Sequence, residues 1–481
     1  MEESLKHKTA NSLKWVTIDI IGDRLLQFII GVILARLLMP AEFGILGLIA
    51  VFIAFSMVFI DSGFSFALIR KITVAEIEYC TVFWFNVSVS IVCYILLWIF
   101  SPYIAGFFNQ QLLKPVIKVI SLSLIINAIG SIQYVNLQRK MQFKELAIVG
   151  IVSKIISGTL ALIMAYRGFG VWSLVAQQVS MNVTRVLMMM LYNKFIPVIS
   201  FSKNAFSELF AFSSKLLYGS ILNSFVSNIY PLAIGKFFSV SNVGFFNRAR
   251  HLQELPVRTF TTIIQKVTLP SFSKIQDEES RFKSAYQKAM KMSVFTIALP
   301  LIIIIVAAYP MINFLLTSKW FPAAHMLRVL AIGGIFYPLS ALNVNIIGIK
   351  GRSDLVMYLQ FIKDGLSIVA LLIGMIWGIN GLVWSFAITG IVSYFLNAYF
   401  ANKVIDYPVI EQIKDVIPIF IIMLISGLTG QFFMSFSLAD VWKIFIVTVC
   451  ISVSYIMLAI ILRLNVLTDT IDLVKIIIKK I

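Results

Sequence analysis

Long apolar runs separated by short polar breaks fill most of this chain. Each run has about 18 to 25 residues, the length that a helix needs to cross the hydrocarbon core of a bilayer. The pattern predicts an all-α polytopic membrane protein with about fourteen transmembrane helices, or twelve if two of the more polar runs do not span. The predicted spans are residues 15–38, 45–69, 82–100, 116–137, 146–166, 171–192, 209–238, 244–272, 294–316, 327–349, 355–377, 382–401, 416–436 and 441–462.

Two polar segments interrupt the pattern in different ways. Residues 273–291 (SKIQDEESRFKSAYQKAMK) carry many charges and predict a cytoplasmic loop with a helical turn or two. In residues 465–481, apolar side chains recur at helical spacing beside three lysines. This last segment is too short to span, and it predicts an amphipathic helix on the anionic inner leaflet of the membrane.

The sequence also repeats itself weakly at an interval of two hundred residues. ARLLMPAEFG at residues 35–44 is echoed by GKFFSVSNVG at residues 235–244, so that Arg36 corresponds to Lys236 and Gly44 to Gly244. A second echo links VWSL, which opens the sixth span, with VWSF, which opens the twelfth. A repeat of six spans keeps both halves in the same orientation, as in transporters whose parallel repeats are related by an axis along the membrane normal.

The repeat predicts four parts. Residues 1–200 form an N-lobe with spans one to six, and residues 201–402 form a C-lobe with spans seven to twelve. Residues 403–464 form a trailing pair of spans, and residues 465–481 form a cytoplasmic tail. Longer polar connectors follow spans six and twelve, where such parts would join.

Composition and charge narrow the functional classes. The chain is 59% hydrophobic and only 13% charged, which is too apolar for a soluble protein. Its formal net charge of +18 could suggest nucleic acid, but Lys and Arg gather in the loops on the side of the N-terminus. They therefore predict cytoplasmic termini and no nucleic-acid partner. The three cysteines have no metal-ligand spacing, so we expect no metal site and no cofactor.

Several motifs resemble one family of exporters. LARLLMPAEFGILGL at residues 34–48 and FIDSGFSFALIRK at residues 59–71 resemble the polysaccharide-transport branch of the multidrug/oligosaccharidyl-lipid/polysaccharide exporter superfamily, in particular the colanic-acid-exporter-like lipopolysaccharide flippases. FFNRARHLQELPVRTF, from Phe245, and GVWSLV, from Gly170, add to the resemblance. Together these motifs cover most of the N-lobe and the start of the C-lobe.

The resemblance implies a fold and a cargo. It implies two six-helix lobes around a central cavity that opens alternately to each side of the bacterial cytoplasmic membrane. The implied cargo is an undecaprenyl-diphosphate-linked oligosaccharide, moved from the inner to the outer leaflet. We expect membrane lipids and a coupling ion, either a proton or sodium, as further partners of a monomeric protein.

Ionisable residues in the first span form the first candidate site. An ionised side chain at the centre of a span costs about 2.5 to 3.5 kcal/mol, so it should face protein or water. Asp19 and Asp23 share one helix face, whereas Arg24 points about 100° away from Asp23. We interpret Arg24 as a cavity cation that binds phosphate, and the two aspartates as coupling carboxylates. The alternative is an ion pair between helices that only fixes their packing.

The eighth span is unusually polar and supplies a second group. Arg248, Arg250 and Arg258 lie on it, with His251 and Glu254 between them. Arginine suits a diphosphate because its planar guanidinium donates two parallel hydrogen bonds to phosphate oxygens. Alternatively, Arg248 and Arg250 cap an outer helix end and meet lipid headgroups.

Three further residues complete the predicted site. Lys154 in the fifth span and Lys363 in the eleventh lie at similar positions of the two repeats, and we interpret both as cavity cations. Asp61 in the second span is the strongest single candidate for a coupling carboxylate. The alternative for Asp61 is an ion pair with a cation of its own lobe.

These predictions favour a flippase for a lipid-linked oligosaccharide. An exporter of drugs or other organic cations with the same fold is the alternative, but its site should favour carboxylates over arginines. A membrane enzyme, such as a glycan polymerase or glycosyltransferase, is disfavoured because the chain has no soluble domain and no clustered acid or His constellation. A purely structural membrane scaffold is a further alternative, although so many charges inside the membrane would be energetically costly for it.

Overall fold

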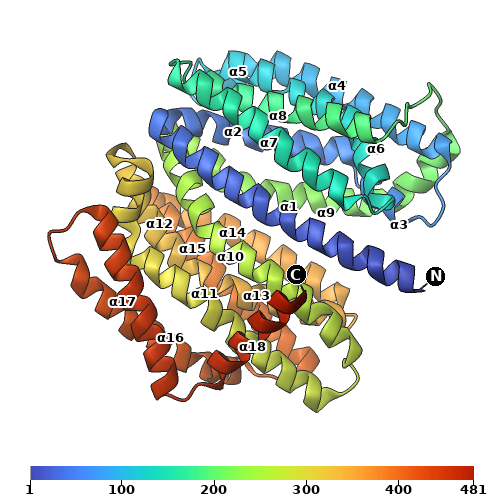
Figure 1. Cartoon of the computed structure of the whole chain (residues 1–481). Helices are drawn as coiled ribbons and strands as arrows, with labels where there is room; N and C mark the ends of the chain where they lie inside the picture. The colour runs from blue at the N-terminus through green and yellow to red at the C-terminus, as the bar shows by residue number, and fades with distance from the viewer. Residues whose placement is uncertain (1, 481) are drawn as a thin grey trace. The chain divides into compact units, whose positions relative to one another are not determined.

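The computed structural model describes residues 2–480, with side chains from residue 15 to residue 472 except at 17, 215, 216, 266, 267, 269 and 270. Throughout this range the regular structure is helical and contains no strand (Figure 1). The prediction of an all-α protein is therefore confirmed. The chain divides into two compact units, Met1–Gly244 and Phe245–Ile481.

The first unit contains nine helices and the first turn of a tenth within the described residues. They are α1 (Glu2–Leu37), α2 (Pro40–Asp61), α3 (Phe64–Arg70), α4 (Glu76–Phe107), α5 (Leu113–Ile120), α6 (Leu122–Arg139), α7 (Phe143–Tyr166), α8 (Val171–Tyr192), α9 (Lys203–Phe237) and the start of α10 (Val240–Lys274). Among these, α1 lies along α7, α7 along α8, and α2 along α9. The lobe boundary at residue 200 refers to the internal repeat, whereas the compact units are defined by packing and divide after Gly244. The lobe boundary therefore stays a prediction.

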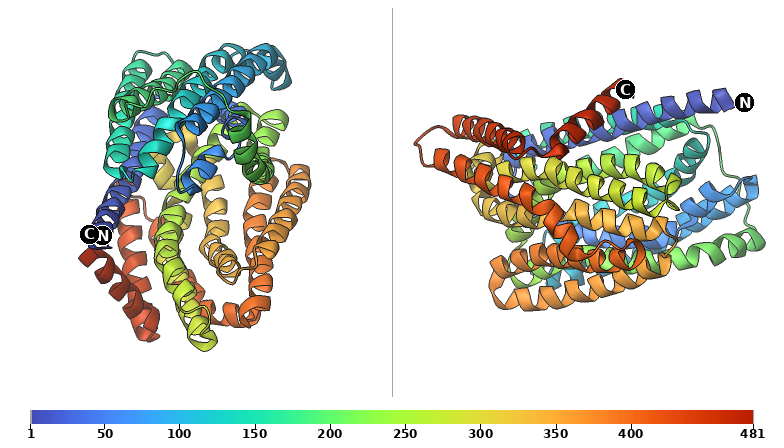
Figure 2. Two further views of the ribbon diagram at one scale, coloured as in Figure 1. Left: turned by 90° about the vertical axis from the view of Figure 1, so that its right-hand side faces the viewer. Right: turned by 90° about the horizontal axis from the view of Figure 1, so that it is seen from below.

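The second unit contains the rest of α10 and eight further α-helices in the described range. They are α11 (Glu279–Leu316), α12 (Phe321–Gly334), α13 (Tyr337–Ile349), α14 (Ser353–Ile376), α15 (Gly378–Ile405), α16 (Val409–Met434), α17 (Asp440–Ile461) and α18 (Asn465–Lys480), with a short 3-10 helix at Ser318–Trp320. The last two long helices, α16 and α17, lie side by side and pack on α11 (Figures 1 and 2).

Every predicted span coincides with one helix or with a broken pair of helices. The second span is broken after Asp61, because Ser62 and Gly63 adopt left-handed conformations with φ of 45° and 80°. The fourth span is divided into α5 and α6, and the tenth into α12 and α13. Apolar run length thus located the spans, but it did not reveal the turns inside them.

The charged segment 273–291 differs from its prediction. It was expected to be mostly loop, yet α11 begins at Glu279 and continues unbroken into the apolar span. Phe282, Tyr286 and Met290 are buried on its inner face. Their spacing of four residues is that of an amphipathic helix, so the charges lie on the opposite face of a helix rather than in a loop.

The number of helices suited to a membrane can be compared with the predicted fourteen. In the described part of the chain, ten helices or broken helices are long and apolar enough to span, and the two segments of α9 together make an eleventh. The long helices outside this set are α1, α8 and α10, and α1 and α10 carry charged residues that the sequence singles out. Together they account for the predicted fourteen, which stays a prediction.

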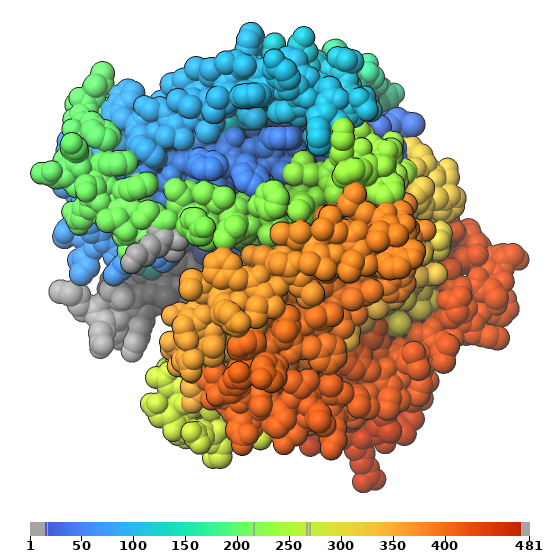
Figure 3. Space-filling view, turned by 180° about the vertical axis from the view of Figure 1, so that it is seen from behind, coloured from blue at the N-terminus to red at the C-terminus, as the bar shows by residue number. Residues whose placement is uncertain are grey.

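Small residues allow the helices to approach closely, as is usual where hydrocarbon surrounds a bundle. A Cβ atom on Gly158 of α7 would lie 2.3 Å from Ile30 of α1, and one on Gly427 of α16 would lie 2.7 Å from Ile302 of α11. The outer faces are apolar instead. Figure 3 shows a broad surface formed by the orange segment, and on α14 of that segment Leu372, Ile373 and Ile376 are exposed. These side chains suit contact with lipid.

Candidate functional site

One group of charges lies between α1 and α7 in the first unit. The Lys154 ammonium forms an ion pair with the Asp23 carboxylate and also donates a hydrogen bond to the Asp23 backbone carbonyl at 3.1 Å. The Lys154 side chain is only 12% exposed, whereas that of Asp23 is 40% exposed. The structure therefore brings together a predicted cavity cation and a predicted coupling carboxylate, in the interhelical pairing that the alternative interpretation described.

Two neighbours extend this group. Asp19 lies one turn before Asp23, and its carboxylate occupies space beside Gly150, where a Cβ atom would lie 3.0 Å from Asp19 Oδ1. Asp19 interacts electrostatically with Asp23, Lys154 and Arg185 of α8. The group thus contains two carboxylates and two cations, and its formal charge is balanced. We call Asp19, Asp23, Lys154 and Arg185 the α1–α7 cluster.

Arg24 is not part of the α1–α7 cluster. It is half-buried on a different face of α1 and makes no hydrogen bond or ion pair with another residue whose side chain is described. This separation is expected from the rotation of about 100° between adjacent helix positions. Arg24 therefore remains a candidate for binding something other than the protein itself.

A second group of charges lies along α10 in the second unit. Glu254 accepts a hydrogen bond from Arg250 Nε at 2.8 Å through one oxygen, and pairs with Arg258 Nε at 2.8 Å through the other. The Arg250 guanidinium also lies 5.2 Å from the ring centre of Phe386 of α15. We call Arg250, Glu254 and Arg258 the α10 ladder. Its two guanidinium groups share one carboxylate, so its formal charge is +1.

Arg248 does not share the face of the ladder. It precedes Arg250 by two residues and therefore points about 200° away around α10. It is half-buried. Over its whole length, α10 carries five Lys or Arg residues and one acidic residue, Glu254, so its formal charge is +4. The sequence predicted three arginines as one group, whereas the structure places them on two faces of one cationic helix.

Lys363 and Asp61 lie apart from both groups. Lys363, on α14, makes no side-chain hydrogen bond or ion pair with the described residues, while its neighbour Asp364 accepts one from Gln360 at 2.8 Å. Asp61 is the last residue of α2, and its carboxylate accepts hydrogen bonds from the Ser65 hydroxyl and backbone N–H. It therefore caps α3 across the helix break. Its role as a coupling carboxylate stays a prediction.

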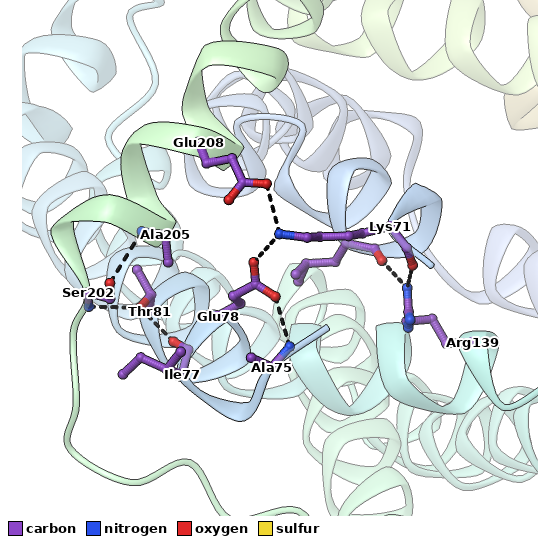
Figure 4. A network of polar contacts seen from close by, with 10 residues as sticks. Lys71, Ala75, Ile77, Glu78, Thr81, Arg139, Ser202, Ala205 and Glu208 are labelled. Carbon is purple, nitrogen blue, oxygen red and sulfur yellow. Dashed lines mark hydrogen bonds and ion pairs between the residues drawn. The ribbon is translucent and has the colours of Figure 1, made fainter. Parts of the chain in front are cut away.

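A further polar network, which sequence reasoning missed, joins the loop after α3 to α4 and α9 (Figure 4). Lys71 Nζ forms ion pairs with Glu78 of α4 and with Glu208 of α9, the latter at 2.8 Å. The hydrogen bonds to Glu208 and then to Glu78 raise the pKa of the Lys71 ammonium above its ordinary value. From the sequence, Lys71 is only a lysine in a loop. Its pairing with Glu208 could not be predicted, because the two residues are 137 positions apart.

Arg139, at the end of α6, fixes the same loop (Figure 4). Its guanidinium donates hydrogen bonds to the backbone carbonyls of Leu68 and Lys71, and to that of Ile72 at 3.1 Å. The last carbonyls of a helix have no partner within the helix, so a guanidinium there satisfies them. Arg139 therefore holds Lys71 in place between the two glutamates.

Comparison with known proteins identifies the family to which this chain belongs. The family of polysaccharide biosynthesis proteins matches residues 33–325, which is more than half of the chain. The chain belongs to this family. The described residues of this family member contain no group of three His, Cys, Asp or Glu side chains arranged to hold a metal ion.

Two relatives are similar to the chain in sequence, and a solved structure is similar to it in fold. The chain is 25% identical over 431 residues to the teichuronic acid biosynthesis protein TuaB of Bacillus subtilis, covering 88% of this chain and 89% of TuaB. It is 24% identical over 407 residues to the lipopolysaccharide biosynthesis protein WzxC of Escherichia coli, covering 83% and 82%. The fold is similar to that of the lipid II flippase MurJ in an inward closed conformation, with a TM-score of 0.76 and 16% identity over 93% of this chain and 98% of MurJ.

Proposed function

We propose that this polysaccharide biosynthesis family member is a flippase that moves a lipid-linked oligosaccharide across the bacterial cytoplasmic membrane by alternating access. Support comes from the names of its relatives, which act in the synthesis of teichuronic acid and lipopolysaccharide, and from its fold, which is similar to that of a lipid II flippase. The proposed cargo is a polyprenyl-diphosphate-linked repeat unit. Both termini are proposed to be cytoplasmic, since the basic loops lie on that side.

The cationic helix α10 is the observation that carries the proposal. A diphosphate and its sugars cannot cross hydrocarbon, whereas the polyprenyl tail can stay in lipid. A helix with a formal charge of +4, including the half-buried Arg250 and the exposed Arg258 of the ladder, offers such a headgroup strong and directional partners. An exporter of organic cations would instead need a site with an excess of carboxylates.

The α1–α7 cluster fits a coupling role better than a cargo role. Because its charges are balanced, it has little attraction for an anionic headgroup. An ion that binds to Asp23 would compete with Lys154, and protonation of Asp23 would release that lysine. We therefore assign Asp19 and Asp23 to coupling with a proton or sodium. The residues assigned to the cargo are Arg24, Arg248, Arg250, Arg258 and Lys363. Lys154 is assigned to both coupling and cargo binding, because it is a cation that pairs with Asp23.

The proposal is tested by deleting the gene in a strain that makes a surface glycan and measuring the lipid-linked precursor on each membrane face. We expect precursor to accumulate on the inner face and surface glycan to disappear, and the native chain to restore both. Absent precursor would indicate an enzyme that acts earlier, and normal glycan would contradict the proposal.

The site assignment has its own test in the same strain. Arg24→Ala and Arg248→Ala should each lower surface glycan at an unchanged protein level. Unchanged export from both variants at normal expression would remove these residues from the site, although the flippase proposal itself would stand.

A further inference from the structure

The connector between α8 and α9, residues 193–202, carries large apolar side chains that the protein does not cover. Ile196 is 80% exposed and Ile199 is 86% exposed, and more than half of the surface of Val198 and of Phe201 is exposed as well. Single apolar side chains are common on protein surfaces, but four within six positions form a contiguous patch, and such a patch marks a binding surface. We call these four residues the connector patch.

The backbone of the connector is held against the beginning of α4. The carbonyl oxygen of Val198 accepts a hydrogen bond from Trp84 Nε1 at 2.9 Å. The backbone N–H of Ser202 donates a hydrogen bond to Thr81 Oγ1 at 3.0 Å (Figure 4). Thr81 and Trp84 are three residues apart, so they share one face of α4. The connector is therefore a fixed part of the first unit, and the exposure of its patch is a property of the fold.

The side chains of the connector alternate between two sides. The ring of Phe195 lies 5.6 Å from the ring of Tyr79 of α4, and Pro197 is half-buried. Ile196 and Val198, which alternate with these two residues, are exposed. This is the pattern of an extended chain that lies with one face on the protein. The other face of the connector is thus available to something outside the chain.

The same hydrogen bonds fix the depth of the connector patch relative to the bilayer. Thr81 and Trp84 lie at the start of the third apolar span, residues 82–100, where the hydrocarbon core begins. A tryptophan at the end of a span lies at the level of the lipid headgroups, because its ring is apolar and its N–H is polar. Here the Trp84 N–H is bound to the connector. The connector patch therefore lies at the boundary between headgroups and hydrocarbon.

Positive charge flanks the connector patch on both sides. Lys194 and Lys203 are exposed, and neither forms an ion pair with another residue whose side chain is described. Residues 193–204 include no acidic residue. Apolar side chains next to lysines match a surface that presents anionic headgroups above hydrocarbon, because the apolar groups enter the acyl boundary while the lysines meet the phosphates.

The loop before α4 repeats this combination. Ile72 is 95% exposed, and its carbonyl oxygen accepts a hydrogen bond from Arg139 at 3.1 Å, so the backbone at this position is held as well. Arg70, two residues earlier, is exposed. The loop is attached to α4 because the Glu78 carboxylate accepts a hydrogen bond from the Ala75 backbone N–H at 2.8 Å. Both segments held at the beginning of α4 thus present isoleucine next to a cation.

We propose that the connector patch inserts into the headgroup region of an anionic lipid leaflet, with Lys194 and Lys203 bound to phospholipid phosphate groups. The occupant is a lipid surface rather than a protein, because a segment at headgroup level meets lipid before it meets any soluble partner. Anionic lipid then holds the junction of the sixth and seventh spans at the membrane surface more firmly than neutral lipid does. This inference goes beyond the proposed function, since it concerns the surrounding lipid and not the cargo.

The test measures the depth of a nitroxide label at Ile199→Cys, in a chain whose three native cysteines are replaced by serine. The purified chain would be placed, one copy per nanodisc, in phosphatidylcholine with or without phosphatidylglycerol. Power-saturation electron resonance compares the accessibility of the label to oxygen, which concentrates in hydrocarbon, and to a neutral nickel chelate, which stays in water. Leu372→Cys on the apolar outer face of α14 and Arg281→Cys in the charged start of α11 serve as references for lipid and for water.

In nanodiscs with phosphatidylglycerol, the ratio of oxygen to nickel accessibility at residue 199 should exceed that at residue 281 about fivefold. Omitting phosphatidylglycerol should lower the ratio at residue 199 about threefold. Lys194→Gln combined with Lys203→Gln should remove this dependence on anionic lipid. A matched control, Lys114→Gln combined with Lys140→Gln, removes the same charge from exposed positions outside the connector and should leave the dependence unchanged.

A label at residue 199 that is as accessible to nickel as the label at residue 281 would overturn the proposal and would assign the patch to a protein partner. Equal ratios with and without phosphatidylglycerol would overturn the role of anionic lipid. The same measurements at Ile196→Cys give a second reading that does not depend on the folding of the first variant. Because neither cargo nor precursor is present, failure here would leave the flippase proposal standing, and failure of that proposal would leave this one standing.

Discussion

The α1–α7 cluster and the α10 ladder use similar residues in opposite ways. In the cluster, charges from separate helices balance, and Lys154 bridges two helices by pairing with Asp23. In the ladder, both arginines and their shared glutamate lie on one helix, and positive charge remains in excess. A balanced pair between helices can hold or release their packing, whereas a cationic face on one helix can bind an anion without changing helix contacts. The comparison suggests that coupling and cargo binding are assigned to different parts of the chain.

The largest effect should come from removing the charge of the ladder while keeping its hydrogen bonds. A triple variant, Arg250→Gln, Glu254→Gln and Arg258→Gln, retains amide partners at the same spacing. We expect surface glycan to fall at least tenfold at an unchanged protein level, because two guanidinium groups that can bind the headgroup are lost. A double variant, Arg250→Lys with Arg258→Lys, keeps the charge but loses the planar guanidinium groups. Its surface glycan should lie between that of the native chain and that of the triple variant. Normal export by the triple variant would contradict the comparison.

The next effect is on stability and belongs to the cluster. Asp23→Lys or Lys154→Asp alone places like charges together, and should lower the free energy of unfolding by about 1 kcal/mol or more. The double variant restores an opposite pair in reversed order and should recover most of that loss. Thermal unfolding of the four proteins in detergent measures this coupling. Additive losses would show that Lys154 and Asp23 do not stabilise each other.

A smaller effect depends on pH and concerns the Lys71 network. The pKa of Lys71 is raised in the folded protein, so its contribution to stability is complete below the ordinary value of 10.5 and is lost as pH rises through the raised value. The thermal midpoint should therefore fall above about pH 10.5, and more steeply in the native chain than in Glu208→Gln. Lys71→Arg, which stays protonated, should lose this part of the pH dependence. An equal alkaline decline in all three proteins would contradict the assignment.

The smallest expected effect is on the stability of Lys363→Gln. Lys363 makes no ion pair within the described part of the chain, so its removal should change the free energy of unfolding by less than about 0.5 kcal/mol. A loss of export without a loss of stability would sharpen the comparison by adding Lys363 to the cargo-binding group. A large loss of stability would show that Lys363 has a structural partner instead.

The spans could be predicted from the sequence because bilayer thickness sets the length of an apolar run. The predicted sixth span, 171–192, has the same limits as α8. The breaks could not be predicted in this way, since the turn at Ser62 and Gly63 lies inside an apolar run. The helical start of α11 was hidden because its charges masked an apolar face at Phe282, Tyr286 and Met290.

Pairing was harder to predict than position. The sequence identified Asp23, Lys154, Arg250 and Arg258 as charges inside spans, but Asp23 and Lys154 are 131 residues apart and only the packing of α1 on α7 brings them together. The ladder was within reach of sequence reasoning, because 250, 254 and 258 follow the spacing of one helix face. Gly44 and Gly244 were matched by the repeat, yet nothing in the repeat indicates that a Cβ atom on Gly244 would lie 2.1 Å from the carbonyl oxygen of Pro40.

The central claim, that the excess positive charge of α10 binds a diphosphate headgroup, is tested most directly by binding. The affinity of the purified native chain for a short-chain prenyl diphosphate would be compared with that for the corresponding prenyl alcohol by calorimetry in detergent. We predict that the diphosphate binds at least tenfold more tightly than the alcohol, and that the triple glutamine variant of the ladder loses this preference. Equal preference for the diphosphate in the native chain and the folded triple variant would contradict the claim.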